Sequence, residues 1–266
     1  MKRFLSFLLF LMIVLPAYAE QHAVERGETA LQIAIEHNLT MEQLGRLNPD
    51  VDLEMMLVGD VLIIPDEGMS FEEFLEHQYG ELIRITDLNC EVLGDQSVLC
   101  LCHAENLSEL PLFDVQLKAE VRGANQARAQ AADVIPMIQI LPGEILPIDL
   151  SIPGTFDEIA EASVKVENLT CSEMLNSSFR IPAEMYSQTD SFLPDGVAVI
   201  STIRFNEADE SMWQDKHINV LAAAYDAAGE LLGVRSLYSD FYSRLDITVY
   251  SNNRRIDHVD IRMEAY

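Results

Sequence analysis

The chain has 266 residues, of which 49% are apolar, and it carries 44 acidic against 17 basic side chains, a net charge of −27. This charge excludes nucleic acid and anionic lipid as partners, because both are polyanions that an acidic surface repels. The apolar content excludes a disordered chain, and the length favours two or three folded modules.

The N-terminus has the three regions of a secretory signal peptide. Lys2 and Arg3 precede an apolar run from Phe4 to Pro16, and Ala17-Tyr18-Ala19 supplies the small residues of a cleavage site. We expect residues 1–19 to be removed, which changes the net charge to 15 − 44 = −29. The alternative is an uncleaved anchor, but the run is shorter than the roughly 20 residues that span a bilayer. No second long apolar segment follows, so no membrane span is predicted after cleavage.

Two short helices are predicted next, each introduced by a capping box. Thr29 is followed three residues later by Gln32, and Thr40 by Gln43. The helices are expected at residues 30–37 and 41–47. The side chains expected to face inward are Leu31, Ile33 and Ala34 on the first helix and Leu44 and Leu47 on the second, with Asn38 as a left-handed C-cap between them.

Short extended segments flank the two helices. Residues 22–24 read as a brief strand, and residues 61–64 as a buried strand that ends at Pro65. The predicted order is therefore β-α-α-β within fewer than 50 residues.

The same stretch resembles the lysin motif (LysM) family over residues 22–65. The matching features are Val24-x-x-Gly27-Glu28-Thr29, Ile33-Ala34, Thr40-x-x-x-Leu44, Leu47-Asn48-Pro49 and Leu57-x-x-Gly59-x-x-Leu62-x-Ile64-Pro65. The resemblance implies a non-catalytic module, residues 20–66, that binds glycans containing N-acetylglucosamine, such as peptidoglycan or chitin. In that family the sugar lies in a shallow groove between the loop entering the first helix and the loop before the last strand.

The resemblance places the candidate glycan site on two loops. One wall is Gly27, Glu28, Thr29 and Ala30, where glycine admits close approach of a ligand and first-turn amides act as donors. The other wall is Leu53, Glu54, Met55, Met56 and Leu57, which offers adaptable apolar contact. The alternative interpretation is that Gly27 to Thr29 form only a turn and a cap and that the methionines belong to the core.

The segment at residues 67–82 mixes acids with apolar side chains about one helical turn apart, including Phe71, Phe74 and Leu75. It is either a linker or a short amphipathic helix that packs on a neighbour.

Period-two alternation dominates from residue 83 onward. Residues 113–121 and 259–265 alternate apolar and polar side chains, and further strands are expected at 98–104, 145–152, 163–167, 197–205, 218–225 and 245–250. Several short strands at this spacing predict two tandem immunoglobulin-like antiparallel β-sandwiches, at 83–175 and 176–266, with a junction near Asn176. The predicted fold class is thus α+β for the small module and all-β for the rest.

An internal repeat supports the tandem arrangement. The segments FDVQLKAEVRG, LPGEILPIDLSIPG and SVKVEN have counterparts in INVLAAAYDAAGELLG, SRLDITVYSNN and VDIRMEAY. The stretch Ala223-Ala224-Tyr225-Asp226-x-x-Gly229-x-x-Leu232-Gly233 resembles the FxLYD-type immunoglobulin-like modules of bacterial extracellular proteins. That resemblance implies a scaffold or interaction role.

The four cysteines are Cys90, Cys100, Cys102 and Cys171. In an exported chain they are disulfide candidates, with three possible connectivities. Cys100 and Cys102 point to the same side of a strand, so we expect them to pair with Cys90 and Cys171 rather than with each other. Their spacing does not suit a zinc knuckle, and no metal is predicted.

No enzyme signature is present. The sequence contains no H-E-x-x-H and no G-x-S-x-G, and no cofactor motif is found. The acidic cluster of residues 207–210 with Asp215 suits a solvated loop better than a calcium site. Trp213 lies beside it, and an exposed ring there would indicate a partner surface.

The prediction is a secreted, cell-wall-associated envelope protein that binds peptidoglycan or chitin and is not an enzyme. The first alternative is that the sandwiches bind another envelope protein and the lysin motif is only structural. The second is an undetected cell-wall hydrolase.

Overall fold

The computed structural model describes residues 18–171, 178–206, 210–213 and 215–266. Most of the expected signal peptide, the junction near Asn176 and residues 207–209 of the acidic cluster lie outside these residues. The chain is mostly antiparallel β-sheet with short helices toward the N-terminus, and it divides into two compact units, one up to Gln78 and one from Tyr79 onward. Each unit is described by itself below.

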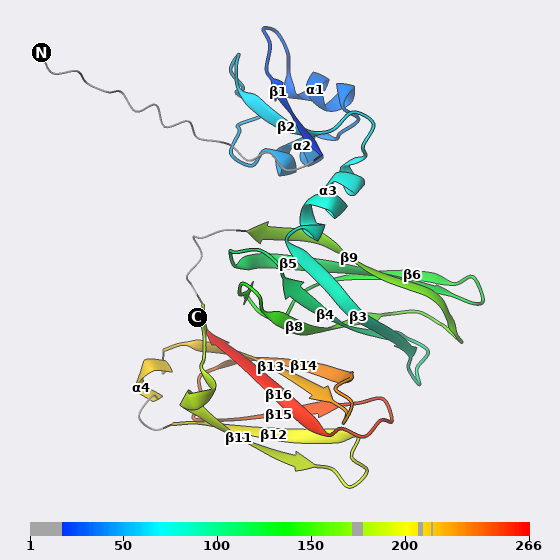
Figure 1. Cartoon of the computed structure of the whole chain (residues 1–266), viewed down its shortest axis with the longest axis vertical. Helices are drawn as coiled ribbons and strands as arrows, with labels where there is room; N and C mark the ends of the chain where they lie inside the picture. The colour runs from blue at the N-terminus through cyan, green and yellow to red at the C-terminus, as the bar shows by residue number, and fades with distance from the viewer. Residues whose placement is uncertain (1–17, 172–177, 207–209, 214) are drawn as a thin grey trace, which may run out of the picture. The chain divides into compact units, whose positions relative to one another are not determined.

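The first unit has the predicted β-α-α-β order followed by a third helix (Figure 1). Its elements are β1 (Ala19–Ala23), α1 (Ala30–Glu36), α2 (Met41–Leu47), β2 (Val61–Pro65) and α3 (Phe71–Gly80). β1 and β2 pair antiparallel, from Ala19 opposite Pro65 to Ala23 opposite Val61. Ala19, the last residue of the expected signal peptide, is thus the first residue of β1.

Both predicted capping boxes are confirmed. The amide of Gln32 donates to Thr29 Oγ1 at 3.3 Å, and Gln32 Oε1 accepts from the amide of Thr29 at 3.1 Å. Thr40 and Gln43 make the same reciprocal pair, at 3.1 and 2.8 Å. Asn38 has a φ of 56°, the left-handed conformation expected between the helices. The turns are therefore set by local chemistry.

One apolar core holds the first unit together. Its buried members are Val24, Ala30, Ile33, Ala34, Leu39, Leu44, Leu62, Ile64 and Phe71, with Leu47 partly buried against them. The expectation that Leu31 is buried is wrong, because its side chain is 57% exposed. Helix α1 turns its i, i+3, i+4 stripe inward beginning at Ala30, so Leu31 lies about 100° around the helix from that stripe.

The segment after the motif is a helix, which confirms the second of the two interpretations of residues 67–82. A capping box not noticed in the sequence starts α3: the amide of Glu73 donates to Ser70 Oγ at 3.1 Å, and Glu73 Oε2 accepts from the Ser70 amide at 2.9 Å. Phe71 belongs to the core of the small module, and Leu75 packs against that core.

The second unit begins with two antiparallel sheets. Their strands are β3 (Ile83–Val92), β4 (Val98–Asn106), β5 (Leu112–Gly123), β6 (Arg128–Val134), β7 (Gln139–Ile140), β8 (Ile145–Ile152) and β9 (Ile159–Cys171). One sheet has the order β3-β4-β8. In the other sheet β5 is central, with β6 and β7 along one edge and β9 along the other.

Two further antiparallel sheets complete the second unit. Their elements are β10 (Phe179–Arg180), the 3₁₀ turn η1 (Ala183–Met185), β11 (Tyr186–Phe192), β12 (Ala198–Phe205), α4 (Glu210–Trp213), β13 (His217–Tyr225), β14 (Leu231–Asp240), β15 (Arg244–Tyr250) and β16 (His258–Ala265). The sheet orders are β10-β16-β13-β14 and β11-β12-β15. Buried side chains from both sheets form one core, which includes Val199, Ile247, Val220 and Met263.

The two sheet pairs repeat one topology. The order β3-β4-β8 corresponds to β11-β12-β15, and β9-β5-β6 corresponds to β16-β13-β14. The three segment pairs noticed in the sequence occupy equivalent strands: β5 with β13, β8 with β15 and β9 with β16. The internal repeat is therefore a repeat of sheet order as well as of sequence pattern.

One of the two expected disulfides is present. Cys90 and Cys100 are directly opposed on β3 and β4 and are bonded to each other. The expectation of a second disulfide is wrong, because Cys102 and Cys171 are both free. Cys100 and Cys102 do share the inner side of β4, but Cys171 ends β9 in the other sheet, and its sulfur lies 3.8 Å from Ser108 Oγ.

Candidate functional site

Backbone hydrogen bonds hold the two candidate loops of the small module side by side. The amide of Val24 donates to the carbonyl of Asp60 at 2.8 Å, and the amide of Gly59 donates to the carbonyl of Val24 at 2.9 Å. The loop that leaves β1 and the loop that enters β2 are therefore neighbours, as the lysin-motif resemblance requires of a shared groove.

The first loop is a tight turn closed by its own acid. Glu28 Oε2 accepts from the amide of Glu25 at 2.7 Å and lies 3.0 Å from His22 Nε2. The Glu25 amide, and next the His22 ring, hold the pKa of the Glu28 carboxyl below its usual value of 4.5. Gly27 has a φ of 96°, and no heavy atom lies within 4 Å of the place where a Cβ would stand. The Glu28 side chain is committed to the loop, while the space beside Gly27 is open.

Two of the four main-chain donors expected at this loop are already in use. The amide of Glu28 donates to the carbonyl of Glu25 at 3.3 Å, and that of Thr29 donates to Gln32. The amides of Ala30 and Leu31 donate to no residue in the described ranges. Such unpaired first-turn groups are normal at a helix start.

The second loop is built from two Asp-centred turns. Asp52 accepts from the amide of Glu54 at 3.0 Å through its side chain and from the amide of Met55 at 3.1 Å through its carbonyl. Asp60 Oδ2 accepts from the amide of Leu57 at 2.7 Å. Gly59 completes the turn with a φ of 96°, a backbone conformation that favours glycine.

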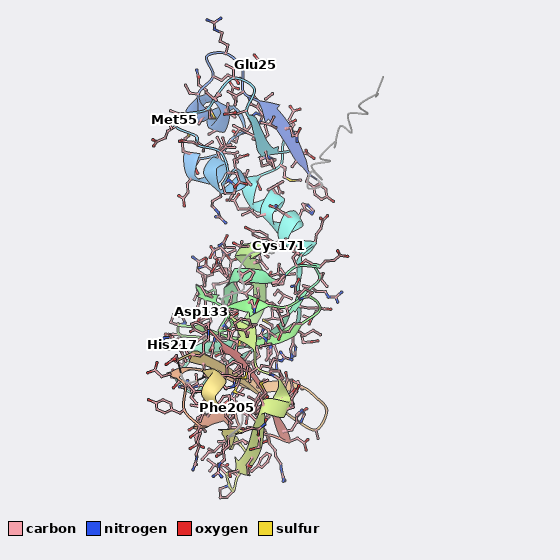
Figure 2. The ribbon with its side chains drawn as sticks, turned by 90° about the vertical axis from the view of Figure 1, so that its left-hand side faces the viewer. Glu25, Met55, Asp133, Cys171, Phe205 and His217 are labelled. Carbon is pink, nitrogen blue, oxygen red and sulfur yellow. A yellow bond between two sulfur atoms is a disulfide. The ribbon has the colours of Figure 1, made fainter. Side chains whose placement is uncertain are left out.

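The five residues predicted on this second wall divide into two groups. Leu53 and Met56 pack against the core, which agrees with the alternative interpretation for Met56 but not for Met55. Met55 and Leu57 are 73% and 71% exposed, and Figure 2 shows Met55 at the outer edge of the module. Glu54 is also exposed.

Sequence reasoning missed a third exposed apolar side chain on this loop, Val58, which is 69% exposed. The signal that could have found it is the Val58-Gly59-Asp60 turn. A residue that precedes a left-handed glycine at the tip of a loop has few neighbours to bury it.

Outside the two loops, the described residues offer no candidate metal centre, and the buried thiol of Cys102 is unreactive. They hold no cluster of three or more metal-binding side chains, and no helix among them is long and apolar enough to cross a bilayer. Burial raises the pKa of the Cys102 thiol to about 12, so that sulfur is not a nucleophile. Trp213 is buried, and its ring therefore offers no partner surface.

Comparison with known proteins adds no identity. No family model matches the chain, and no curated protein matches it. Among solved structures, a structural genomics target named SoR45 is 9% identical with a TM-score of 0.21, covering 66% of this chain and 93% of that one. BuGH86 in complex with neoagarooctaose is 10% identical with a TM-score of 0.21, covering 81% of this chain and 40% of that one. Likeness at this score supports no statement about fold or function.

Proposed function

We propose that residues 20–66 are a lysin-motif module that binds a glycan containing N-acetylglucosamine, such as peptidoglycan or chitin. The observation that carries the proposal is the pairing of the two loops through Val24, Gly59 and Asp60. This pairing places the open side of Gly27 on one loop and the exposed Met55 and Leu57 on the loop joined to it. A backbone edge and flexible apolar side chains on two paired loops suit a sugar that carries acetamide groups.

The proposed binding is weak for a single module. Residues 22–65 contain no Phe, Tyr or Trp, so no flat aromatic ring is available to stack on a pyranose. Contact therefore depends on methionine and leucine side chains and on the two amides left unpaired at the start of α1. We expect dissociation constants near the millimolar range for short oligosaccharides.

In this proposal the chain is an exported, non-catalytic envelope protein, and the two sheet pairs of the second unit are immunoglobulin-like sandwiches that the module holds at the wall. A Cys90–Cys100 disulfide supports export, because such bonds persist in oxidising compartments.

Titration of the full chain with chitohexaose, followed by calorimetry, tests the proposal. The double variant Met55→Ser/Leu57→Ser should lose at least tenfold in affinity while the fold is kept, because both side chains are exposed. Tyr250→Ser, at a 65% exposed site in the second unit, is the matched control and should bind as the parent does. Equal binding by all three proteins, or none by the parent at millimolar sugar, contradicts glycan recognition at these loops.

One observation favours the alternative of a protein partner on the second unit. His217, Tyr238 and Tyr266 have ring centroids 5.6 to 6.0 Å apart, and Tyr238 is 59% exposed. Exposed aromatic rings are enriched at protein interfaces. A comparison of wall retention separates the two functions: loss in Tyr238→Ser with retention in the Met55/Leu57 variant favours the partner.

No described residue set favours a hydrolase, and a peptidoglycan zymogram tests that alternative.

A further inference from the structure

The outer face of β5 carries a basic arrangement that is unusual for so acidic a chain. Along β5, Lys118, Glu120 and Arg122 alternate with the buried Leu117, Ala119 and Val121, so the charged side chains share the outer face. Figure 1 shows β6, β5 and β9 side by side in this sheet. Their side chains at matching register therefore meet on one surface.

Like charges oppose each other twice on this surface. Arg122 on β5 is directly opposite Arg128 on β6, and Lys118 on β5 is directly opposite Lys165 on β9. Direct cross-strand pairs of like charge are destabilising. The chain has 17 basic and 44 acidic residues, so two directly opposed pairs of basic side chains are unexpected. Features that lower stability in this way concentrate at functional sites.

The acids of the surface pair with residues other than Arg128. Glu161, opposite Arg122 on β9, accepts from its Nη2 at 2.7 Å and from its Nε at 3.1 Å. Glu120 pairs with Lys118 at 3.2 Å. Arg128 makes no ion pair with any residue in the described part of the chain. Among the charged residues that line the hollow described next, Arg122 and Arg128 balance Glu120 and Glu161, so the sum is 2 − 2 = 0. The excess of positive charge is local to Arg128, because Glu161 is bonded to Arg122 and Glu120 to Lys118.

The same residues surround a hollow. A cavity of about 560 Å³ is lined by Arg122, Arg128, Gln130 and Ser163, together with both acids of the face. Gln130 and Ser163 both lie across from Glu120, one on each side of β5. The hollow thus offers one unpaired guanidinium, a second that an acid holds in place, and two neutral hydrogen-bonding groups.

We propose that this hollow binds an oxyanion, the carboxylate or phosphate group of a small ligand, with Arg128 as the principal contact. A guanidinium presents a planar fork of donors that matches two oxygens of such a group. A bound anion also offsets the repulsion between Arg122 and Arg128. Relief of this repulsion adds to the free energy of binding. The site is separate from the glycan loops and does not rest on the proposed function.

Nitrogen-15 NMR of the arginine Nε–Hε groups in the full chain tests the proposal, with citrate and inorganic phosphate as the two probes. At low ionic strength we expect saturable shifts for Arg122 and Arg128 with at least one probe, and the stronger probe identifies the preferred anion. Arg128→Ala should weaken binding at least tenfold, and Arg128→Lys should recover only part of it, because an ammonium lacks the fork.

Arg244→Ala is the control, since Arg244 is an exposed arginine of the second unit that already pairs with Asp246 at 2.9 Å. Its variant should bind both probes as the parent does. Three results overturn the proposal: no saturation with either anion, unchanged binding in Arg128→Ala, or an equal loss in Arg244→Ala. The last of these would mean that the anions respond to charge in general and not to this hollow.

Discussion

Arg180 on β10 donates to both carboxylate oxygens of Glu144, from Nε at 3.0 Å and from Nη2 at 2.6 Å. Glu144 lies in the turn before β8, so this pair joins the second sheet pair to the first. Arg180 also donates to Glu264 at 2.9 Å and to the carbonyl of Gln139 at 2.8 Å. The four bonds fix one guanidinium between two halves of the unit.

The contact between the halves has an apolar part as well. Leu101 on the outer side of β4 packs in a buried cluster with Ala223 of β13 and Leu231 of β14. Nearby, the rings of His103 and Tyr225 are parallel, with centroids 6.3 Å apart. Because polar and apolar contacts cross the same boundary, the repeated sheet pairs form one unit and should unfold together.

Replacing Arg180 with methionine should destabilise the second unit by about 3 kcal/mol, because it leaves the buried Glu264 and the part-buried Glu144 without their cation. Arg244→Met is the matched control: its side chain is 56% exposed and pairs with an exposed aspartate, so the loss should stay under about 1 kcal/mol. Urea unfolding followed through Trp213 fluorescence measures both. Similar losses of unfolding free energy in the two variants would show that the Arg180 ion pairs stabilise the unit no more than an exposed pair does.

Glu264→Gln should change how stability depends on pH. Burial raises the pKa of Glu264 above its usual 4.5, although the amide of Ile138 and the charge of Arg180 oppose the shift. A carboxyl with a raised pKa contributes its full stability below pH 4.5, and this contribution is lost as the pH rises through the folded-state pKa. Glutamine does not titrate, so relative to the parent the variant should gain stability as the pH rises above 4.5. Glu158→Gln, at an exposed position, should run parallel to the parent.

The cysteines should react at two very different rates. In denaturant without reductant the chain should release two thiols to Ellman's reagent, since Cys90 and Cys100 are bonded. In the native state Cys171 should react first, because Cys102 is fully buried and its pKa of about 12 leaves roughly one molecule in 10⁴ as thiolate at pH 8. Cys171→Ser should abolish the fast phase. Release of four thiols would contradict the disulfide.

Short-range rules predicted the parts of this fold that depend on neighbours in sequence. The capping boxes at Thr29 and Thr40 were readable because each needs only four consecutive residues. Alternation predicted strands such as β5 for the same reason. The prediction for Leu31 was wrong because periodicity gives the spacing of the apolar residues of a helix. It does not say which face of a seven-residue helix packs against the rest of the module.

Contacts between distant strands were not predictable from one sequence. Nothing near Cys171 indicates that β9 ends in the sheet opposite Cys102. The Arg180–Glu144 pair joins residues 36 apart, and the Arg122–Arg128 opposition depends on the register of a hairpin. Such features follow from tertiary geometry, and the hollow on β5 depends on that register because it brings Arg122 and Arg128 together.

In the small module, Asn48→Ala should cost about 3 kcal/mol. Asn48 is 5% exposed; its Nδ2 donates to the carbonyls of Leu44 and Ile63, both at 2.9 Å, and its Oδ1 accepts from the amide of Ile63 at 2.7 Å. Alanine leaves these three main-chain groups without partners inside the protein, at roughly 1 kcal/mol or more each. The side chain thus fastens the end of α2 to β2, and this bond positions the loop between them that carries Met55.

Hydrogen exchange of peptides from residues 19–65 in the full chain measures the effect, since it reports this module alone. Asn38→Gly is the matched control, because Asn38 is exposed with a φ of 56° that glycine adopts freely, and it should leave exchange nearly unchanged. If Asn48→Ala exchanges no faster than Asn38→Gly, the link between α2 and β2 does not stabilise the module. In that case Asn48→Ala should bind chitohexaose as the parent does. If the substitution loosens the loop that carries Met55, chitohexaose binding should weaken.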